Sequence, residues 1–116
     1  MKYFKDKEDF KGNMDKMDPK LLTMLDDLRE EYGQPIILNS SYRPASHPVE
    51  IVKSKPGEHT YGAAVDIKCA GGENTFNLVS AAIKVGFKRI GISRKSNFIH
   101  VGIGYPGAPK TTIWTY

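Results

Sequence analysis

The order of the apolar segments along the chain constrains its fold more than any other feature of the sequence. Two segments, residues 19–32 and 74–85, repeat apolar residues at helical spacing. The remaining apolar segments are short, and turns rich in glycine, proline or polar residues separate them. We therefore expect strands at residues 36–42, 63–69, 89–92 and 98–103, and a terminal strand or apolar plug at 113–116. Hairpin-type neighbours outnumber helical crossovers in this order, so the sequence predicts an α+β domain with two main helices and a mainly antiparallel sheet.

Both expected helices have recognisable ends. Asp18 and Pro19 form a helix start, because aspartate is a preferred N-cap and proline fits the first helical position. Gly33 and Gly86 follow the last helical residues, as C-terminal glycines commonly do. In the second helix the spacing predicts a core-facing set made of Phe76, Val79, Ala82 and Ile83.

Length and composition exclude several classes of protein. The 116 residues fit one domain, 1–116, in which we expect residues 1–16 to form an ordered N-terminal arm. The contents of 40% hydrophobic and 26% charged residues are those of a globular protein and not of a disordered or fibrous chain. No apolar run is long enough to span a bilayer, and the first ten residues lack the apolar core of a signal peptide. The single cysteine, Cys69, excludes an internal disulfide and a multi-cysteine zinc site.

The charge of the chain is moderately basic. Its formal net charge is +4 and its pI is about 9.2, which suits any polyanionic partner. The sequence has no block of consecutive basic residues, helix-turn-helix pattern, RNP motif or zinc finger. We therefore expect no nucleic-acid partner. Nothing in the sequence indicates an obligate assembly, and we expect a monomer.

Two histidines and one aspartate are candidate metal ligands. His59 ends a loop rich in glycine and proline, Asp66 lies in the strand that follows, and His100 lies in a later strand. Strand alternation places Asp66 and His100 opposite their apolar neighbours, so the three side chains can meet if the two strands are adjacent. Two imidazoles and a carboxylate around an open fourth position are the ligand set of a catalytic zinc ion. On residue types alone, the alternative of ordinary buried or surface side chains stays open.

The residues around these candidates resemble a known family. His59, Gly62, Ala64 and Asp66 match the pattern H-x-x-G-x-A-x-D, the zinc signature of the D-alanyl-D-alanine carboxypeptidase group. This group shares a fold family with lysostaphin-type peptidases and the hedgehog signalling domain. Three satellites occur in the same order as in the family: Ser41-Tyr42-Arg43-Pro44, Phe98-Ile99-His100-Val101 and the closing Ile113-Trp114-Thr115-Tyr116. The resemblance covers roughly residues 17–116.

The resemblance implies a hedgehog/D-Ala-D-Ala-peptidase-like fold and a zinc metallopeptidase. Its substrate would be the peptide stems of bacterial peptidoglycan, cut by endopeptidase or carboxypeptidase action as in phage endolysins. One zinc ion would be held by His59, Asp66 and His100. Without a signal peptide, such a protein is expected in the host cytoplasm before release, or with the virion, from where it would act on the cell wall. Which peptidoglycan bond is cut stays open, because relatives cut different ones.

Three further polar residues are candidates for substrate binding. By resemblance, Arg43 would hold a carboxylate or a carbonyl of the peptide, a task that suits its planar guanidinium. The alternative is that Arg43 pairs with a surface acid. Tyr61 and His47 are other polar groups expected near the site.

Three positions depart from the family pattern. Gly57 replaces a usual serine, Asn97 stands where many relatives have an acid, and Gly102 stands where small relatives often have the aspartate of His-x-Asp. No Asp or Glu occurs in residues 86–116, so the catalytic base stays open. Glu58, Glu50 and Glu73 are acids that could reach the site from elsewhere. Glu58 is adjacent to His59, but adjacent residues of an extended chain point in opposite directions, so we expect Glu58 to be a solvated loop acid. The alternative function is therefore a zinc- and wall-binding relative with little or no activity. If only a base is lacking, Gly102→Asp is expected to raise activity.

Overall fold

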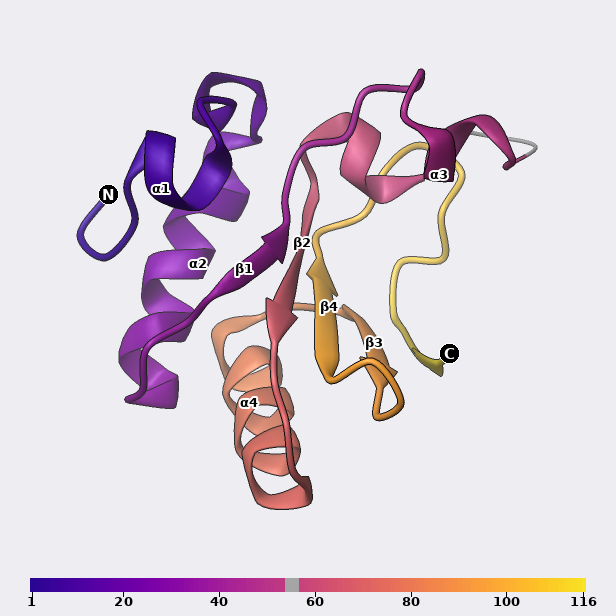
Figure 1. The fold of residues 1–116 in the computed structure, drawn as a ribbon. Coiled ribbons are helices and arrows are strands. Elements are labelled where there is room, and N and C mark those ends of the chain that lie inside the picture. Colours follow the sequence, from indigo (N-terminus) through magenta and orange to yellow (C-terminus); the bar gives the residue numbers. More distant parts are fainter. Residues whose placement is uncertain (54–56) are drawn as a thin grey trace.

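A five-stranded mixed sheet lies at the centre of the fold (Figure 1). The computed structural model describes residues 1–53 and 57–116, so part of the loop expected before His59 lies outside the described residues. The strands stand in the order β1-β2-β4-β3-β5. Neighbouring strands are antiparallel, except that β5 runs parallel to β3. The strand bounds are Leu38–Ser40 for β1, Ala64–Lys68 for β2, Arg89–Ser93 for β3, Phe98–Gly102 for β4 and Thr112–Thr115 for β5.

The two expected main helices are present, and the predicted α+β class is confirmed. Helix α2 (Pro19–Tyr32) has Asp18 as its N-cap, and the Asp18 side chain accepts a hydrogen bond of 2.8 Å from the backbone N–H of Lys20. It ends at Gly33, where φ is 75°. The main helices are α2 (Pro19–Tyr32) and α4 (Gly72–Val85); the shorter ones are α1 (Asp6–Phe10), α3 (Pro48–Ile51) and the 3-10 turns η1 (Met14–Lys16) and η2 (Glu58–Tyr61). Among the described residues, no helix is both long and apolar enough to cross a bilayer.

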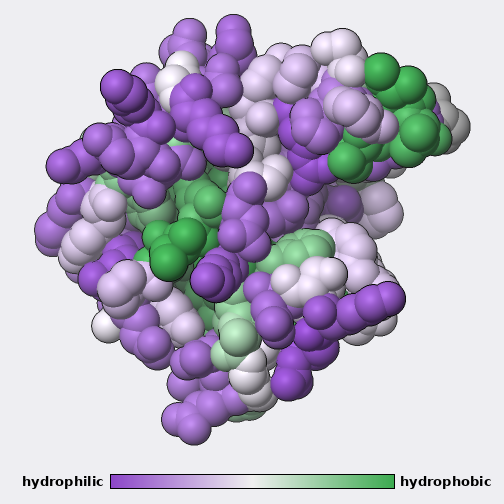
Figure 2. Space-filling model, viewed as in Figure 1, coloured by the Kyte–Doolittle hydropathy of each residue, from purple (hydrophilic) through white to green (hydrophobic). Residues whose placement is uncertain are grey.

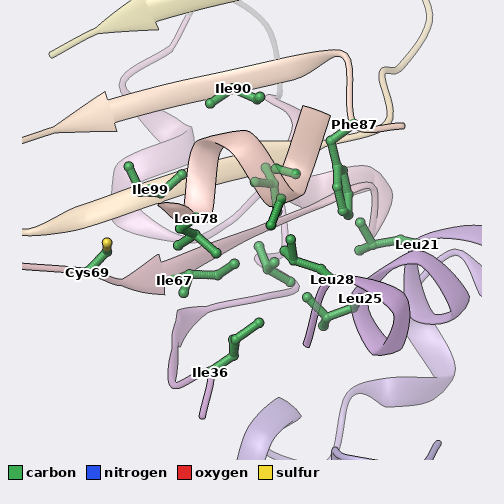
Figure 3. Packing of buried hydrophobic residues seen from close by; sticks show 14 of the residues in the cluster. Leu21, Leu25, Leu28, Ile36, Ile67, Cys69, Leu78, Phe87, Ile90 and Ile99 are labelled. Atoms are coloured by element: carbon green, nitrogen blue, oxygen red, sulfur yellow. The ribbon is translucent and has the colours of Figure 1, made fainter. Parts of the chain in front are cut away.

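The main helices pack against one face of the sheet (Figure 3). From α2, Leu21, Leu25 and Leu28 are fully buried in the same cluster as the strand residues Ile67 and Ile99. Burying one leucine side chain stabilises a fold by roughly 1.5–3 kcal/mol, so this contact holds α2 on the sheet. The alternation predicted for the strands is confirmed. Val65, Ile67, Ile99 and Val101 belong to the core cluster that includes the helices, and Asp66 and His100 lie on the opposite face of β2 and β4.

The predicted inward face of α4 is wrong in part. Phe76 and Ile83 are 71% and 59% exposed, whereas Leu78, Ala81 and Ala82 are buried. Helix α4 carries apolar residues on two sides, so spacing alone does not identify the packed side. The buried side is the one with small alanines, which let the helix approach its neighbours closely.

The first sixteen residues pack on the body through aromatic side chains. Phe4 and Phe10 are buried in the main core cluster, with ring centroids 6.2 Å apart. The backbone of η1 then passes close to Gly62, the residue that follows η2. A Cβ at position 62 would collide with the carbonyl oxygen of Lys16, and φ of Gly62 is 63°. Glycine is therefore required where the H-x-x-G signature places it.

Candidate metal centre

Strand pairing brings the three candidate ligands together on the polar face of the sheet. Asp66 of β2 lies directly opposite His100 of β4 in the antiparallel register. The turn η2 carries His59 over the same face. One ligand atom from each of the three residues lies within 4.8 Å of the other two, and all three side chains are buried. The three residues that the sequence singles out thus form one cluster that can hold a metal ion.

Hydrogen bonds orient the ring of His59. Its Nδ1 lies 2.7 Å from the carbonyl oxygen of Ser41. A carbonyl oxygen only accepts hydrogen bonds, so Nδ1 carries the proton and Nε2 is turned toward Asp66, 3.3 Å from Oδ1. Ser41 belongs to the segment that resembles the family upstream of the signature. In this chain the backbone of that segment therefore contacts the first residue of the signature, His59.

His100 has the opposite orientation. Its Nδ1 lies 3.1 Å from Oδ1 of Asp66, and its Nε2 lies 2.7 Å from Oε1 of Glu58. The two histidine rings stand edge to face with centroids 5.1 Å apart. The atoms that face the common centre are therefore Nε2 of His59, Nδ1 of His100 and Oδ1 of Asp66. In metal sites, a carboxylate or carbonyl on the far nitrogen of a histidine orients the ring in this manner.

Opposing effects act on the titration of the cluster. Burial by itself raises the pKa of Asp66, but the hydrogen bonds and charges of His100 and His59 outweigh it and hold that pKa well below its usual range. Burial lowers the pKa of His100, but its hydrogen bonds to Asp66 and Glu58 raise it above the ordinary value. For Glu58, burial is outweighed by His100, the Gly104 N–H and Arg89, so its pKa is lowered. The carboxylates are thus held in the ionised form that metal coordination requires.

Arg43 is paired with two acids at the edge of this cluster. Its terminal nitrogens donate hydrogen bonds to Oδ2 of Asp66 and to Oε2 of Glu50, and both donor–acceptor distances are 3.2 Å. Its Nε donates to the hydroxyl of Ser40. Both acids are buried, with Glu50 only 3% exposed. Arg43 thus pairs with acids, as the alternative interpretation of this residue had it, but the acids are buried and not at the surface. The second oxygen of Asp66 is held by Arg43 while the first faces the two histidines.

Glu58 does not behave as the sequence suggested. We expected a solvated loop acid, but Glu58 is only 4% exposed. The physical reason is that residues 58–61 form a 3-10 turn instead of an extended chain. The side chains of the adjacent residues Glu58 and His59 are therefore both buried. Besides the contact with His100, its Oε2 accepts hydrogen bonds from Nε of Arg89 at 3.1 Å and from the Gly104 N–H at 2.7 Å.

A cleft of about 610 Å³ opens over the cluster. Its wall next to His100 is formed by Trp114 of β5, whose ring centroid lies 5.1 Å from that of the histidine. A Cβ at Gly91 would lie 2.6 Å from the indole, so the glycine admits the ring. The cleft also carries three basic and three further aromatic side chains: Arg43, Lys53, Arg89, Phe98, Tyr105 and Tyr116.

An apolar patch borders the cleft at α3 (Figure 2). Val49 lines the cleft and is 46% exposed, and Ile51 and Val52 are 64% and 84% exposed. His47 is the N-cap of this helix, where its Nδ1 accepts a hydrogen bond of 3.1 Å from the Val49 N–H. His47 is not among the described residues that line the cleft over the metal cluster.

Tyr61 lies beside the cleft and not in the cluster. It is 48% exposed and its ring stacks on Tyr105, a cleft residue, with centroids 5.4 Å apart. Substrate binding by Tyr61, His47 and Arg43 stays a prediction.

Sequence reasoning missed Arg89, which lines the cleft and pairs with Glu58. A signal exists for Arg89: strand alternation puts it on the face of β3 that Gly91 shares, and Gly91 pairs with His100. A charged residue on the same face as candidate ligands is a sign of a role at the site. Glu50, one of the acids that the sequence offered as able to reach the site, lies in the short helix α3 and pairs with Arg43 and Lys53.

The comparison with known families agrees with this geometry. No curated protein matches the chain. The family model for Peptidase M15, a family of zinc-dependent peptidases, matches residues 3–102, a range that includes His59, Asp66 and His100. The match covers most of the 116 residues. The zinc dependence of the family agrees with the two imidazole nitrogens and the carboxylate oxygen that lie together in the cleft. The chain therefore belongs to the Peptidase M15 family.

Proposed function

We propose that this protein is a zinc-dependent metallopeptidase that hydrolyses amide bonds in the peptide stems of bacterial peptidoglycan. The observation that carries the proposal is the convergence of His59, Asp66 and His100 on one cleft, in a member of a peptidase family. The peptidoglycan substrate is supported by the resemblance of the zinc signature to the D-alanyl-D-alanine carboxypeptidase group. As in small relatives from phages, the protein would act on the cell wall after release from the host or delivery with the virion, as a monomer.

The donor set of the cluster fits zinc. Nitrogen from two imidazoles and one carboxylate oxygen are ligands that zinc takes in catalytic sites, where a fourth position stays open. Each ligand also has a second partner that orients it: Ser41 for His59, Glu58 for His100 and Arg43 for Asp66. Zinc at such a site acidifies water and polarises the scissile carbonyl.

The basic side chains of the cleft suit a substrate with free carboxylates. Each terminal nitrogen of Arg43 carries two N–H groups, and one of each is used by Asp66 or Glu50. The remaining N–H groups can bind a carboxylate or a carbonyl of the peptide. Lys53, whose side chain is 39% exposed, also lines this cleft, with its Nζ 2.8 Å from Oε2 of Glu50. Stem peptides contain free carboxylates, so they match this lining.

A specific observation also favours a second candidate function, a zinc- and wall-binding relative with little or no activity. A peptidase needs a group that takes a proton from water and passes it to the leaving amine. Both oxygens of Glu58, the acid beside the cluster, accept hydrogen bonds from protein groups. Residues 86–116 contain no Asp or Glu that could serve instead.

The experiment that separates the two functions uses purified sacculi. Zinc-loaded protein, chelator-treated protein and the Asp66→Asn variant would be incubated with sacculi, and the released peptides identified by mass spectrometry. Peptides that require zinc and Asp66 support the peptidase, and their masses identify the bond. Zinc-loaded protein that sediments with sacculi and releases no peptide supports the binding relative and contradicts the peptidase.

A further inference from the structure

The Glu58 carboxylate occupies space that exists because residue 102 is a glycine. Gly102 lies two residues after His100 in β4, on the same face of the sheet. A Cβ built on Gly102 would collide with the carboxyl carbon and both oxygens of Glu58. This collision cannot be relieved cheaply, because the carboxylate is anchored and is not the free end of a flexible chain.

Three donors anchor the carboxylate in that space. Oε2 accepts from Nε of Arg89 and from the Gly104 N–H, at 3.1 and 2.7 Å. Oε1 is thereby directed at Nε2 of His100, 2.7 Å away. The side chains of Arg89 and Glu58 are 9% and 2% exposed, so the guanidinium is a buried counter-ion for the carboxylate. A buried carboxylate with both oxygens engaged is a fixed hydrogen-bond acceptor.

We infer that Glu58 and Gly102 are a matched pair, in which Gly102 admits the Glu58 carboxylate and Glu58 positions His100 by accepting the hydrogen bond of its Nε2–H. The inference rests on the proposed function for the metal that His100 would bind. It assigns Glu58 a positioning role and not that of the base. It also reverses the expectation for Gly102→Asp: in the native background an aspartate at position 102 would displace Glu58, so it weakens the site.

The test is a set of variants at the two positions, with zinc affinity measured by competition against a chromophoric chelator. Glu58→Gln keeps the shape, but its one acceptor oxygen cannot serve His100, Arg89 and Gly104 together. We expect zinc binding about 10–100-fold weaker, as for other partners of metal-bound histidines. Gly102→Ala is expected to weaken it by a similar factor, although residue 102 supplies no ligand. The controls are Glu73→Gln and Gly72→Ala, because Glu73 is exposed and a Cβ on Gly72 meets Arg94 at an ordinary 3.7 Å.

The double variant Glu58→Ala/Gly102→Asp is the sharpest member of the set. It removes the carboxylate from one position and restores one at the other, beside the same nitrogen of His100. We expect it to bind zinc more tightly than either Glu58→Ala or Gly102→Asp alone, a coupling that independent sites do not show. Circular dichroism and urea unfolding of the metal-free variants check that each one folds.

The protonation of His100 can also be measured on the wild-type protein, which avoids variants that fail to fold. In ¹⁵N-detected NMR of the zinc-loaded protein, we expect His100 to carry its proton on Nε2, protected from exchange. A proton on Nδ1, or a Gly102→Ala variant that binds zinc as tightly as Gly72→Ala, overturns the inference. Wild-type protein that binds zinc and releases no peptide from sacculi contradicts the proposed peptidase. The matched pair would still be supported by the affinity coupling.

Discussion

At the scale of single residues, the site is organised by buried acids that each form hydrogen bonds with arginine and histidine side chains. Asp66 receives two histidines on one oxygen and Arg43 on the other, and Glu58 holds His100 and Arg89. Burying a charge is unfavourable unless it is paired and hydrogen-bonded, and these acids satisfy that condition. The orientation of the ligands is therefore a property of the surrounding pairs as much as of the ligands.

Replacing Arg43 with lysine tests whether this residue acts on Asp66 or only on substrate. Lysine keeps the charge but loses the planar fork that reaches Asp66 and Glu50 at the same time. We expect zinc affinity to fall about 10-fold, together with peptide release from sacculi. Arg94→Lys, at an exposed arginine, is the matched control. Unchanged zinc affinity in Arg43→Lys would restrict the residue to substrate binding.

Glu50 predicts a pH dependence of stability. Burial alone raises its pKa, but Lys53, the Gly57 N–H and Arg43 outweigh burial and hold the pKa below its ordinary value of 4.5. A group with a lowered pKa in the folded state stabilises the fold above its unfolded pKa, and this stabilisation is lost as the pH falls. The free energy of unfolding of metal-free protein is therefore expected to fall below roughly pH 5.

The difference between wild type and Glu50→Gln isolates this contribution. Urea unfolding at several pH values from about 7 to 3 gives a stability difference that is largest at neutral pH and shrinks on acidification. A difference that stays constant over this range would show that the Glu50 charge does not stabilise the fold.

At the scale of elements, the site depends on a few short turns that carry side chains onto the sheet. The turn η2 carries both Glu58 and His59, and it ends at Gly62 against the backbone of Lys16. The N-terminal segment therefore supports the turn that bears His59, the first candidate metal ligand. A substitution that moves the backbone of this turn is therefore expected to displace His59 as well.

Two glycine substitutions separate backbone conformation from close approach. Gly33 and Gly62 both have positive φ, 75° and 63°, but a Cβ on Gly33 meets nothing within 4 Å whereas one on Gly62 collides with Lys16. Gly33→Ala is expected to destabilise the protein by about 1–2 kcal/mol, the strain of the left-handed conformation. Gly62→Ala is expected to exceed that value and also to weaken zinc binding. Equal losses in urea unfolding would argue against a tight contact at η2.

At the scale of the whole molecule, the sheet separates a packed face from a functional face. The apolar side chains of β2 and β4 face α2 and α4, and Asp66 and His100 project into the cleft on the other side. Because the metal site joins η2, β2 and β4, a bound metal links segments that are far apart in sequence. A metal that binds the folded state and not the unfolded state therefore stabilises the folded protein as a whole.

Zinc is accordingly expected to raise the free energy of unfolding. At a free zinc concentration 100 times the dissociation constant, the increase should be about 2.7 kcal/mol. Thermal or urea unfolding with buffered zinc and with chelator measures it, and the Asp66→Asn variant, which lacks one ligand, should show a smaller increase. A wild-type curve that zinc does not move would contradict a zinc site in the folded protein.

The sequence by itself determined the main elements and the three candidate ligands. Helix α2 with both its ends and the alternation of β2 and β4 follow from signals between near neighbours in the chain. The grouping of His59, Asp66 and His100 was predicted from the resemblance of their motifs to a zinc peptidase family, and the pairing of β2 with β4 brings them together. Caps, turns and strand alternation depend on residues a few positions apart, so one sequence is enough to predict them.

Only the tertiary structure decided which side of α4 packs and how the ligands are held. Two faces of α4 carry apolar residues, and the neighbours that bury Leu78 and leave Phe76 exposed come from distant segments. Likewise, the position of the Glu58 carboxylate depends on the space at Gly102, which comes 44 residues later in the sequence, and on the hydrogen bond from Arg89. Volume and hydrogen-bond complementarity between distant positions exist once the chain has folded, and no local pattern of the sequence encodes them.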